Sequence, residues 1–308
     1  MKWLVYGSKG WIGSALVKIL ESLHIPDNHV YHGESRVNDL NSVEEEIKKI
    51  APDRVLSLIG RTSGPGYNTI DYLEQKGKLV ENINDNLFSP VLLALVCKKY
   101  DIHFTYMGTG CIFKYDNDKF ALNNGNGFKE SDLPNFFGSS YSTVKGFTDR
   151  LFHVMEECGY NNLLNIRIRM PITADMHPKN FITKICNYEK VVNIPNSMTV
   201  LPELLPIMID MSLKKVTGTV NLTNPGTISH NEILDMYREI VDNTKTYTNF
   251  TEEEQDKILL SERSNNLLDT TCLSTLYPHV KDIKTSVRDI LNEIKKNNTE
   301  IFLLGLKV

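Results

Sequence analysis

The sequence predicts an α/β fold in which a doubly wound parallel sheet is followed by a smaller C-terminal part. Short apolar runs alternate with amphipathic stretches from the first residues on, which is typical of βαβ units. A glycine-rich turn from Gly7 to Gly13 follows the first apolar run and precedes a helical pattern. The 308 residues are enough for one large domain with a smaller one attached.

The first half of this pattern gives three strands and two helices in order. The expected strands are Trp3 to Tyr6, His29 to His32 and Val55 to Ile59, and the first helix is Trp11 to Leu23. Ser42 and Glu45 form a capping-box pair, which predicts the start of the second helix, and Pro52 ends it.

The second half continues the alternation until about residue 170. We expect a helix from Leu79 to Tyr100, a strand from Ile102 to Met107, a helix after Tyr141 and a strand from Leu163 to Ile168. The parallel sheet then has six or more strands. The stretch from Cys111 to Ser140 is rich in Asn, Gly, Asp and Pro, and loops of this length are usually functional.

The alternation weakens after Pro171, which predicts two parts. Residues 1–170 form the cofactor domain and residues 171–308 form mainly the substrate-binding part. Thr217 to Leu222 is apolar enough to return to the main sheet.

The composition narrows the class of protein. The formal net charge of -4 and the absence of a charged tail argue against a nucleic-acid partner. The first apolar run reaches glycine at Gly7, too soon for a signal peptide or a membrane span, so we expect a cytoplasmic protein without a membrane anchor. Five cysteines without a C-x-x-C pair favour neither a disulfide framework nor structural zinc, and we expect no metal.

The turn Gly7-Ser8-Lys9-Gly10-Trp11-Ile12-Gly13 has the context of a dinucleotide-binding turn. Gly7 can adopt the turn, Gly10 lets the backbone approach a pyrophosphate, and Gly13 permits close packing of helix on strand. A chance glycine turn is the alternative. The sequence therefore favours a Rossmann-type domain.

The end of the second strand carries the residues expected at the adenosine ribose. Glu34 can bind a 2'-hydroxyl, whereas Arg36, with Lys9 nearby, can neutralise a 2'-phosphate. We expect NADPH as the cofactor, with NADH as the alternative. Arg36 as an ordinary surface cation is the competing interpretation.

A second constellation points to carbonyl reduction. Tyr141 and Lys145 lie four residues apart on one face of a predicted helix, so an ammonium can favour the phenolate of a proton-transferring tyrosine. Thr109 follows a strand end, where its hydroxyl can meet a carbonyl oxygen. Each feature alone is also compatible with an ordinary surface helix or a turn threonine.

Together, this glycine turn and the order Thr109, Tyr141, Lys145 resemble the extended short-chain dehydrogenase/reductases. The resemblance implies that Asn86 corresponds to the helix asparagine of that family and that Asp39-Leu40 contacts the adenine side of the cofactor. The cofactor contacts that it implies are Gly7, Lys9, Gly10, Trp11, Ile12, Gly13, Arg36, Asp39, Leu40, Ile59, Gly60, Tyr141 and Lys145. The segment Ile59 to Gly64 departs from a more alanine-rich turn.

Several longer segments resemble a narrower family, the bifunctional UDP-4-keto-6-deoxyglucose 3,5-epimerase/4-reductases of plant type. They are Gly108 to Phe113, Gly127 to Glu130, Pro134 to Phe136, Arg167 to Ile172, Asn180 to Met198, Asn224 to Gly226, Ser229 to Glu232 and Arg263 to Asn266. The resemblance implies synthesis of UDP-L-rhamnose: inversion at C3 and C5 of a 4-keto sugar, then reduction at C4 with NADPH.

The resemblance also implies roles for single residues. Cys111 and Lys184 exchange protons with the sugar, although Lys179 lies close enough in sequence to compete with Lys184. Asn86, Thr109, Asn180 and Arg263 lie near the sugar nucleotide. A buried inert cysteine and solvated cations are the alternative interpretations.

Further expectations follow from the same resemblance. The protein is a homodimer joined through helices near Leu87 to Val96 and Lys145 to Met155, and a 4,6-dehydratase on another chain supplies its substrate. Two other functions stay open: a reductase that receives already epimerised sugar, and a non-catalytic regulatory subunit that binds NADP. The choice between UDP and dTDP is also open.

Overall fold

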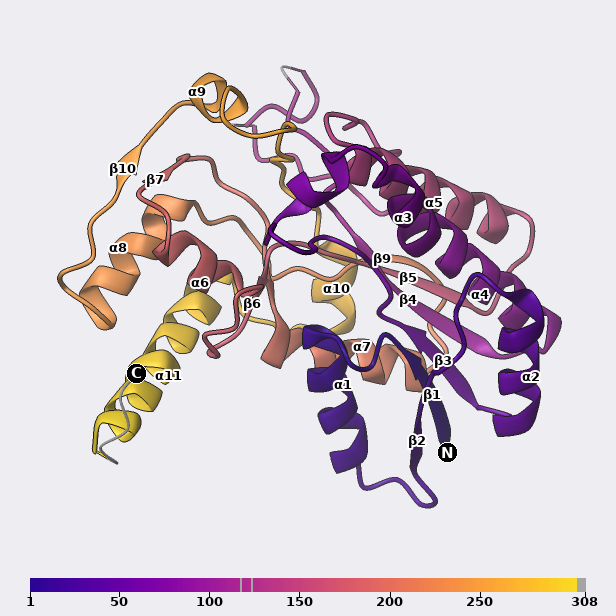
Figure 1. The fold of residues 1–308 in the computed structure, drawn as a ribbon. Helices are drawn as coiled ribbons and strands as arrows, with labels where there is room; N and C mark the ends of the chain where they lie inside the picture. The colour runs from indigo at the N-terminus through magenta and orange to yellow at the C-terminus, as the bar shows by residue number, and fades with distance from the viewer. Residues whose placement is uncertain (117, 123, 304–308) are drawn as a thin grey trace.

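The fold is that of a computed structural model, which describes residues 1–116, 118–122 and 124–303 and the side chains among them up to residue 299. Its centre is a parallel sheet with the strand order β2-β1-β3-β4-β5-β9 (Figure 1). The strands are β1 (Lys2–Tyr6), β2 (His29–His32), β3 (Arg54–Ser57), β4 (His103–Thr109), β5 (Leu163–Ile168) and β9 (Gly218–Asn221). The predicted α/β fold with a parallel sheet is confirmed, including the return of residues 218–221 to the sheet beside β5.

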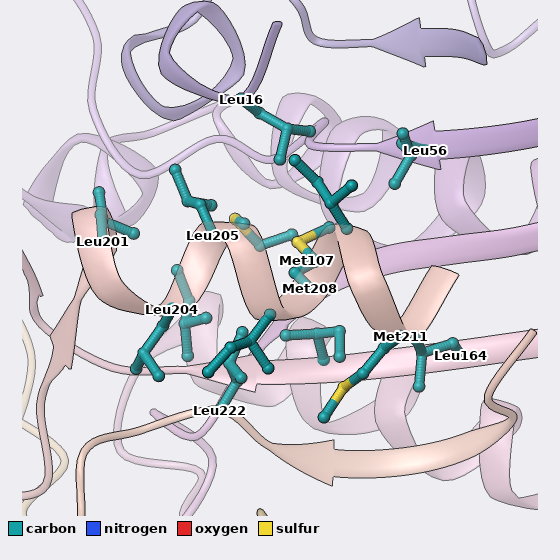
Figure 2. Close-up of a cluster of buried hydrophobic side chains, with 14 of the residues drawn as sticks. Leu16, Leu56, Met107, Leu164, Leu201, Leu204, Leu205, Met208, Met211 and Leu222 are labelled. Atoms are coloured by element: carbon teal, nitrogen blue, oxygen red, sulfur yellow. The ribbon is translucent and has the colours of Figure 1, made fainter. Parts of the chain in front are cut away.

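Helices cover both faces of this sheet, as a doubly wound fold requires. One face packs against α1 (Trp11–Ser22) and α7 (Leu201–Leu213). The other face packs against α2 (Leu40–Ile50), α4 (Ser89–Lys99) and α5 (Ser140–Glu157). Figure 2 shows Leu204, Leu205, Met208 and Met211 of α7 gathered over Met107 and Leu164 of the sheet. This packing fixes the carboxyl ends of β4 and β5, where the candidate site lies.

Two helical predictions differ from the structure. The second helix begins at Leu40, not at a Ser42 capping box, because the Asp39 side chain caps it by accepting from the Asn41 N–H. The predicted helix over residues 79–100 is divided into α3 (Leu79–Ile83), a π-helical turn (Asn84–Phe88) and α4. Such turns inside helices often occur at functional sites, and this one contains Asn86.

The C-terminal part has its own apolar core. It contains β6 (Pro171–Ile172) paired with β8 (Thr199–Val200), and β7 (Lys190–Val191) paired with β10 (Thr248–Asn249). Its helices are α6 (Phe181–Cys186), α8 (His230–Ile240), α9 (Glu252–Asp256), α10 (Thr271–Leu276) and α11 (Ile283–Leu303). Elements β6, β8, α6, α8 and α11 bury a shared cluster of side chains. Among the described helices, none has the length and apolar character needed to cross a bilayer.

Candidate active site

The glycine turn after β1 leaves the start of α1 open to an anion. Gly7 has a positive φ of 76°, and Gly10 caps α1 without any side-chain hydrogen bond. A Cβ on Gly13 would lie 2.1 Å from the Gly7 carbonyl oxygen. The backbone therefore approaches as closely as a pyrophosphate-binding turn requires, with free N–H groups at the positive end of the helix.

Gly13→Ala tests this close packing. The added methyl group must push α1 away from the turn, so we expect a lower melting temperature and at least a roughly tenfold weaker binding of NADPH. Calorimetric titration measures the affinity. Ser14→Ala, an exposed change at the next position, is the matched control. Unchanged affinity in Gly13→Ala would contradict this role for the turn.

A cavity of about 290 Å³ lies beside the turn, where the ribose of a dinucleotide is expected. It is lined by Gly7, Ser8, Lys9, Gly33 and Glu34. Lys9 and Glu34 thus face this space as the sequence predicts, whereas Arg36 is exposed and does not line it.

The loop after β2 is held by one carboxylate. Glu46 accepts hydrogen bonds from the Glu34 N–H at 2.7 Å, the Ser35 N–H at 3.3 Å and the Tyr6 hydroxyl at 2.7 Å. Glu46, on α2, therefore fixes the backbone of Glu34 and Ser35 beside the ribose cavity.

Asn86 is fully buried, and its amide is used within the protein. Its Nδ2 donates to the Arg61 carbonyl and to Asn82, and its Oδ1 accepts from the Arg61 N–H. A Cβ on Gly60 would lie 3.3 Å from this Oδ1. Asn86 therefore ties the Ile59-Gly60 loop to the π-helical turn.

Thr109 and Tyr141 lie together at the end of β4. Thr109 is the last residue of that strand, and its hydroxyl accepts from the Cys111 N–H at 3.0 Å. Tyr141 lies in the first turn of α5, which Ser139 caps. Burial raises the pKa of Tyr141, and a hydrogen bond with the Thr109 side chain opposes that rise, so the two hydroxyls lie close to each other.

The groups that shift the pKa of Tyr141 differ from those that the sequence predicts. Burial raises its pKa above the ordinary value, and Cys111 raises it further, whereas Thr109 and Arg169 act against the rise. Lys145 does not supply the expected counter-effect, because its ammonium donates to the hydroxyl of Tyr106. Tyr141 is therefore held as a neutral phenol, which suits a proton donor.

Lys145 is buried beside this phenol. Desolvation lowers its pKa to about 7, and the nearby Asp149 and Cys111 oppose that shift. Sequence reasoning missed Tyr106. It lies on β4 three residues before Thr109, and that spacing alone does not show that it meets Lys145.

Cys111 and Lys184 are near enough for their charges to interact. Burial lowers the pKa of Lys184, the cations Lys179 and Arg263 lower it further, and Cys111 acts in the opposite direction. Lys179 is exposed, whereas Lys184 is largely buried on α6. A desolvated lysine near a thiol can exchange protons near neutral pH, which an exposed lysine does less readily.

Asn180 and Arg263 both have partners within the protein. The Oδ1 of Asn180 caps α6 by accepting from Ile182, and its Nδ2 donates to the carbonyl groups of Thr173 and Asp175. Arg263 forms an ion pair with Asp71 at 2.6 Å. Asn180 thus positions the helix that carries Lys184, and Arg263 is paired with Asp71 in this structure.

The cofactor turn touches the C-terminal part directly. The indole of Trp11 stacks on the His177 ring at 5.1 Å between centroids, and its Nε1 donates to Asp175 at 3.1 Å. His177 carried no sequence signal, because the contact joins segments 166 positions apart only through the fold.

The fold is that of an extended short-chain dehydrogenase/reductase. The UDP-rhamnose synthase from Acanthamoeba polyphaga mimivirus matches with a TM-score of 0.89 and 55% identity, over 95% of this chain and 99% of that one. A bifunctional dTDP-4-dehydrorhamnose 3,5-epimerase/dTDP-4-dehydrorhamnose reductase from Arabidopsis thaliana is 44% identical over 97% of this chain and 94% of its own length. The chain therefore belongs to the family of bifunctional nucleotide-rhamnose 3,5-epimerase/4-reductases.

More distant structures share the fold alone. A dTDP-4-dehydrorhamnose reductase from Bacillus anthracis, solved with NADP, has a TM-score of 0.74 at 15% identity and covers 95% of this chain and 99% of that one. No family model matches the sequence.

Proposed function

We propose that this protein makes UDP-L-rhamnose from UDP-4-keto-6-deoxy-D-glucose, by 3,5-epimerisation followed by NADPH-dependent reduction at C4. The carrying observation is that Cys111 packs against Tyr141 and that its N–H donates to the Thr109 hydroxyl, with Lys145 and Lys184 near enough for the thiol to affect the pKa of each. One site would thus hold groups for both reactions. The relatives with 44% and 55% identity support the same pair of activities.

Epimerisation requires two groups that exchange protons with carbons beside a ketone. Removal of the proton at C3 or C5 leaves an enolate whose charge rests on O4, and a proton returned from the opposite face inverts that carbon. We assign these steps to Cys111 and Lys184. Either can act as acid or base at each carbon.

Reduction requires a proton donor at O4. Tyr141, kept neutral by burial, donates that proton while Thr109 orients its hydroxyl. Lys145, which donates to Tyr106 in this structure, would have to turn toward Tyr141 to stabilise the phenolate that remains. NADPH held at the glycine turn would supply the hydride for C4. Cys111 and Lys184 would then have to reach the flanking carbons C3 and C5.

Incubation with UDP-4-keto-6-deoxyglucose and NADPH in heavy water tests the whole proposal. We expect a rhamnose product that carries two deuterons on carbon, read by mass spectrometry. Product without these deuterons, formed only from already epimerised sugar, would favour the monofunctional reductase. Cofactor binding without turnover would favour the regulatory subunit.

NADPH is the preferred dinucleotide in this proposal because Lys9 lines the ribose cavity and Arg36 lies on the loop beside it. Removing both cations in Lys9→Ala/Arg36→Ala is expected to weaken NADPH binding by about tenfold or more and to leave NADH binding within about twofold. Fluorescence titration of both cofactors measures this. Lys18→Ala/Lys295→Ala removes the same charge at exposed positions that do not line this cavity. Equal losses for both cofactors would contradict a 2'-phosphate site.

A homodimer through the helices beside the site completes the proposal. Large apolar side chains remain exposed on α3, the π-helical turn, α4 and α5, which lie together on one side of the sheet (Figure 1). They are Leu79, Val80, Ile83, Phe88, Leu95, Phe147, Leu151 and Val154. Monomers rarely expose such a contiguous apolar surface, and a two-fold axis would bury it against its own copy.

Phe147→Asp should convert the dimer into a monomer because it places a charge in this apolar surface. Phe147 is 57% exposed on α5. Light scattering after size exclusion measures the mass. Leu276→Asp, on α10 and 52% exposed, adds the same charge outside the surface and should leave the dimer intact. A monomeric parent protein would sink the proposal.

Two further parts of the proposal concern its setting. Residues 171–308 form mainly the sugar-nucleotide part and residues 1–170 the cofactor domain. A 4,6-dehydratase would supply the 4-keto sugar, and the reaction would take place in the cytoplasm.

A further inference from the structure

Two buried arginines near the end of β5 have different surroundings. Arg167 and Arg169 are each at most 1% exposed. Arg167 forms a two-bond ion pair with Asp149, with Nε at 2.9 Å and Nη2 at 2.7 Å from its oxygens. Arg169 has no carboxylate within 4.0 Å among the residues that the structure describes. Its charge therefore lacks the counter-ion that its neighbour has.

The hydrogen bonds of Arg169 all reach neutral groups. Its acceptors are the carbonyl oxygens of Gly110 at 3.1 Å, Ser197 at 3.3 Å and Ser264 at 3.0 Å, the Ser264 hydroxyl at 2.8 Å and the Asn196 Oδ1 at 2.7 Å. A guanidinium has five N–H donors, so its hydrogen-bonding capacity is filled. Its charge remains unbalanced.

A buried, unbalanced charge costs free energy, and a well-packed apolar side chain at the same place would often be no less stable. The stability of the fold therefore does not explain why an arginine occupies position 169. Unbalanced charges of this kind are typical of sites that must stabilise an opposite charge which forms only during the reaction.

The field of Arg169 reaches the candidate site. The ionisable groups close enough to interact with its charge are Cys111, Tyr115 and Tyr141. The aliphatic part of the Arg169 side chain also packs against the turn that carries Cys111. A Cβ on Gly110 would lie 3.0 Å from the Arg169 Cγ. The arginine thus donates to the Gly110 carbonyl and places a fixed cation at the turn that carries Cys111, against which Tyr141 packs.

We propose that Arg169 is a positioning residue whose charge balances the anions that form at Cys111 and Tyr141 during catalysis. When the thiol releases its proton, the guanidinium faces a thiolate. When Tyr141 gives its proton to O4, the guanidinium faces a phenolate. The assignment of these two steps rests on the proposed function, but the effect of the charge on the Cys111 thiol does not.

Three variants separate charge from shape. Arg169→Gln removes the charge, and Arg169→Lys keeps it with fewer hydrogen bonds. Asn196→Asp keeps the shape of the Asn196 side chain but puts a carboxylate oxygen where Arg169 now meets an amide oxygen. It also removes the amide N–H bonds to Ile194 and Asn265, so the fold of this variant is checked before its charge effect is read. This last change supplies the missing counter-ion without removing the arginine. Asn249→Asp, on the exposed strand β10, is the charge-matched control.

The measurement is the rate at which iodoacetamide modifies Cys111 near neutral pH, relative to the exposed Cys158 of the same molecule, by mass spectrometry of the two peptides. Only the thiolate reacts, so loss of the balancing charge should lower this ratio by about tenfold or more. We expect that loss in Arg169→Gln and in Asn196→Asp. Arg169→Lys should stay within about threefold of the parent, and Asn249→Asp should be unchanged.

The outcomes decide between a charge effect and a structural role. An unchanged ratio in a folded Asn196→Asp protein, checked by circular dichroism, would overturn the proposal even if Arg169→Gln does not fold. An equal loss in Arg169→Lys and Arg169→Gln would also overturn it, since shape would then matter rather than charge. Alkylation needs no substrate, so a protein that makes no rhamnose can still pass or fail this test.

Discussion

Replacing Tyr141 by phenylalanine is expected to lower kcat for reduction at C4 by about a thousandfold, because a positioned general acid contributes about 10²- to 10⁴-fold. The ring volume and its burial are kept, so the fold should be unaffected. Deuterium exchange at C3 and C5 should continue within about tenfold of the parent rate, since Cys111 and Lys184 remain.

The loss of NADPH absorbance measures the reduction, and mass spectrometry of the sugar in heavy water measures the exchange. Tyr237→Phe, a buried change in the core of the C-terminal part, controls for the loss of a hydroxyl. Normal reduction in Tyr141→Phe would show that another group protonates O4. Equal loss of exchange and reduction would show that Tyr141 serves both reactions.

Cys111→Ser should impair epimerisation and leave reduction largely intact. A hydroxyl is a far weaker acid than a thiol, so proton exchange with C3 and C5 should fall by about a thousandfold. Reduction of sugar that has already been epimerised should stay within about tenfold, because Thr109, Tyr141 and Lys145 are intact. The two variants together would assign each activity to its own group.

The control for this variant is Cys158→Ser, which changes an exposed cysteine in the same way. Retained exchange in Cys111→Ser would leave Lys184 with another partner and favour a reductase that receives epimerised sugar. Loss of both activities with a folded protein would show that the thiol also orders the reduction site.

The parts of the site that could be predicted from sequence are those that local spacing determines. The positions of Gly7, Gly10 and Gly13 between a strand and a helix define the cofactor turn, because backbone conformation there depends on the absence of side chains. The four-residue spacing of Tyr141 and Lys145 places both on one face of α5. The six-stranded sheet follows from alternation along the chain in the same local way.

The same local reasoning failed where two signals compete. Ser42 and Glu45 match a capping box, yet Asp39 caps the helix three residues earlier. Both are acceptable caps, and in the structure Asp39 accepts from the Asn41 N–H and from the Ser42 hydroxyl, so Ser42 itself does not cap the helix. The sequence from Leu79 to Tyr100 predicts a single helix, because a π-helical turn inserts a residue without changing the sequence pattern.

The sequence by itself thus determined the fold class and the position of the glycine turn, and it predicted the groups proposed to transfer protons. Only the tertiary structure decided their partners: Lys145 with Tyr106, Arg263 with Asp71, and Arg169 with neutral acceptors instead of a carboxylate. The physical reason is distance along the chain. Local conformation depends on neighbouring residues, whereas the charge balance of a buried group depends on residues up to 192 positions away that packing brings beside it.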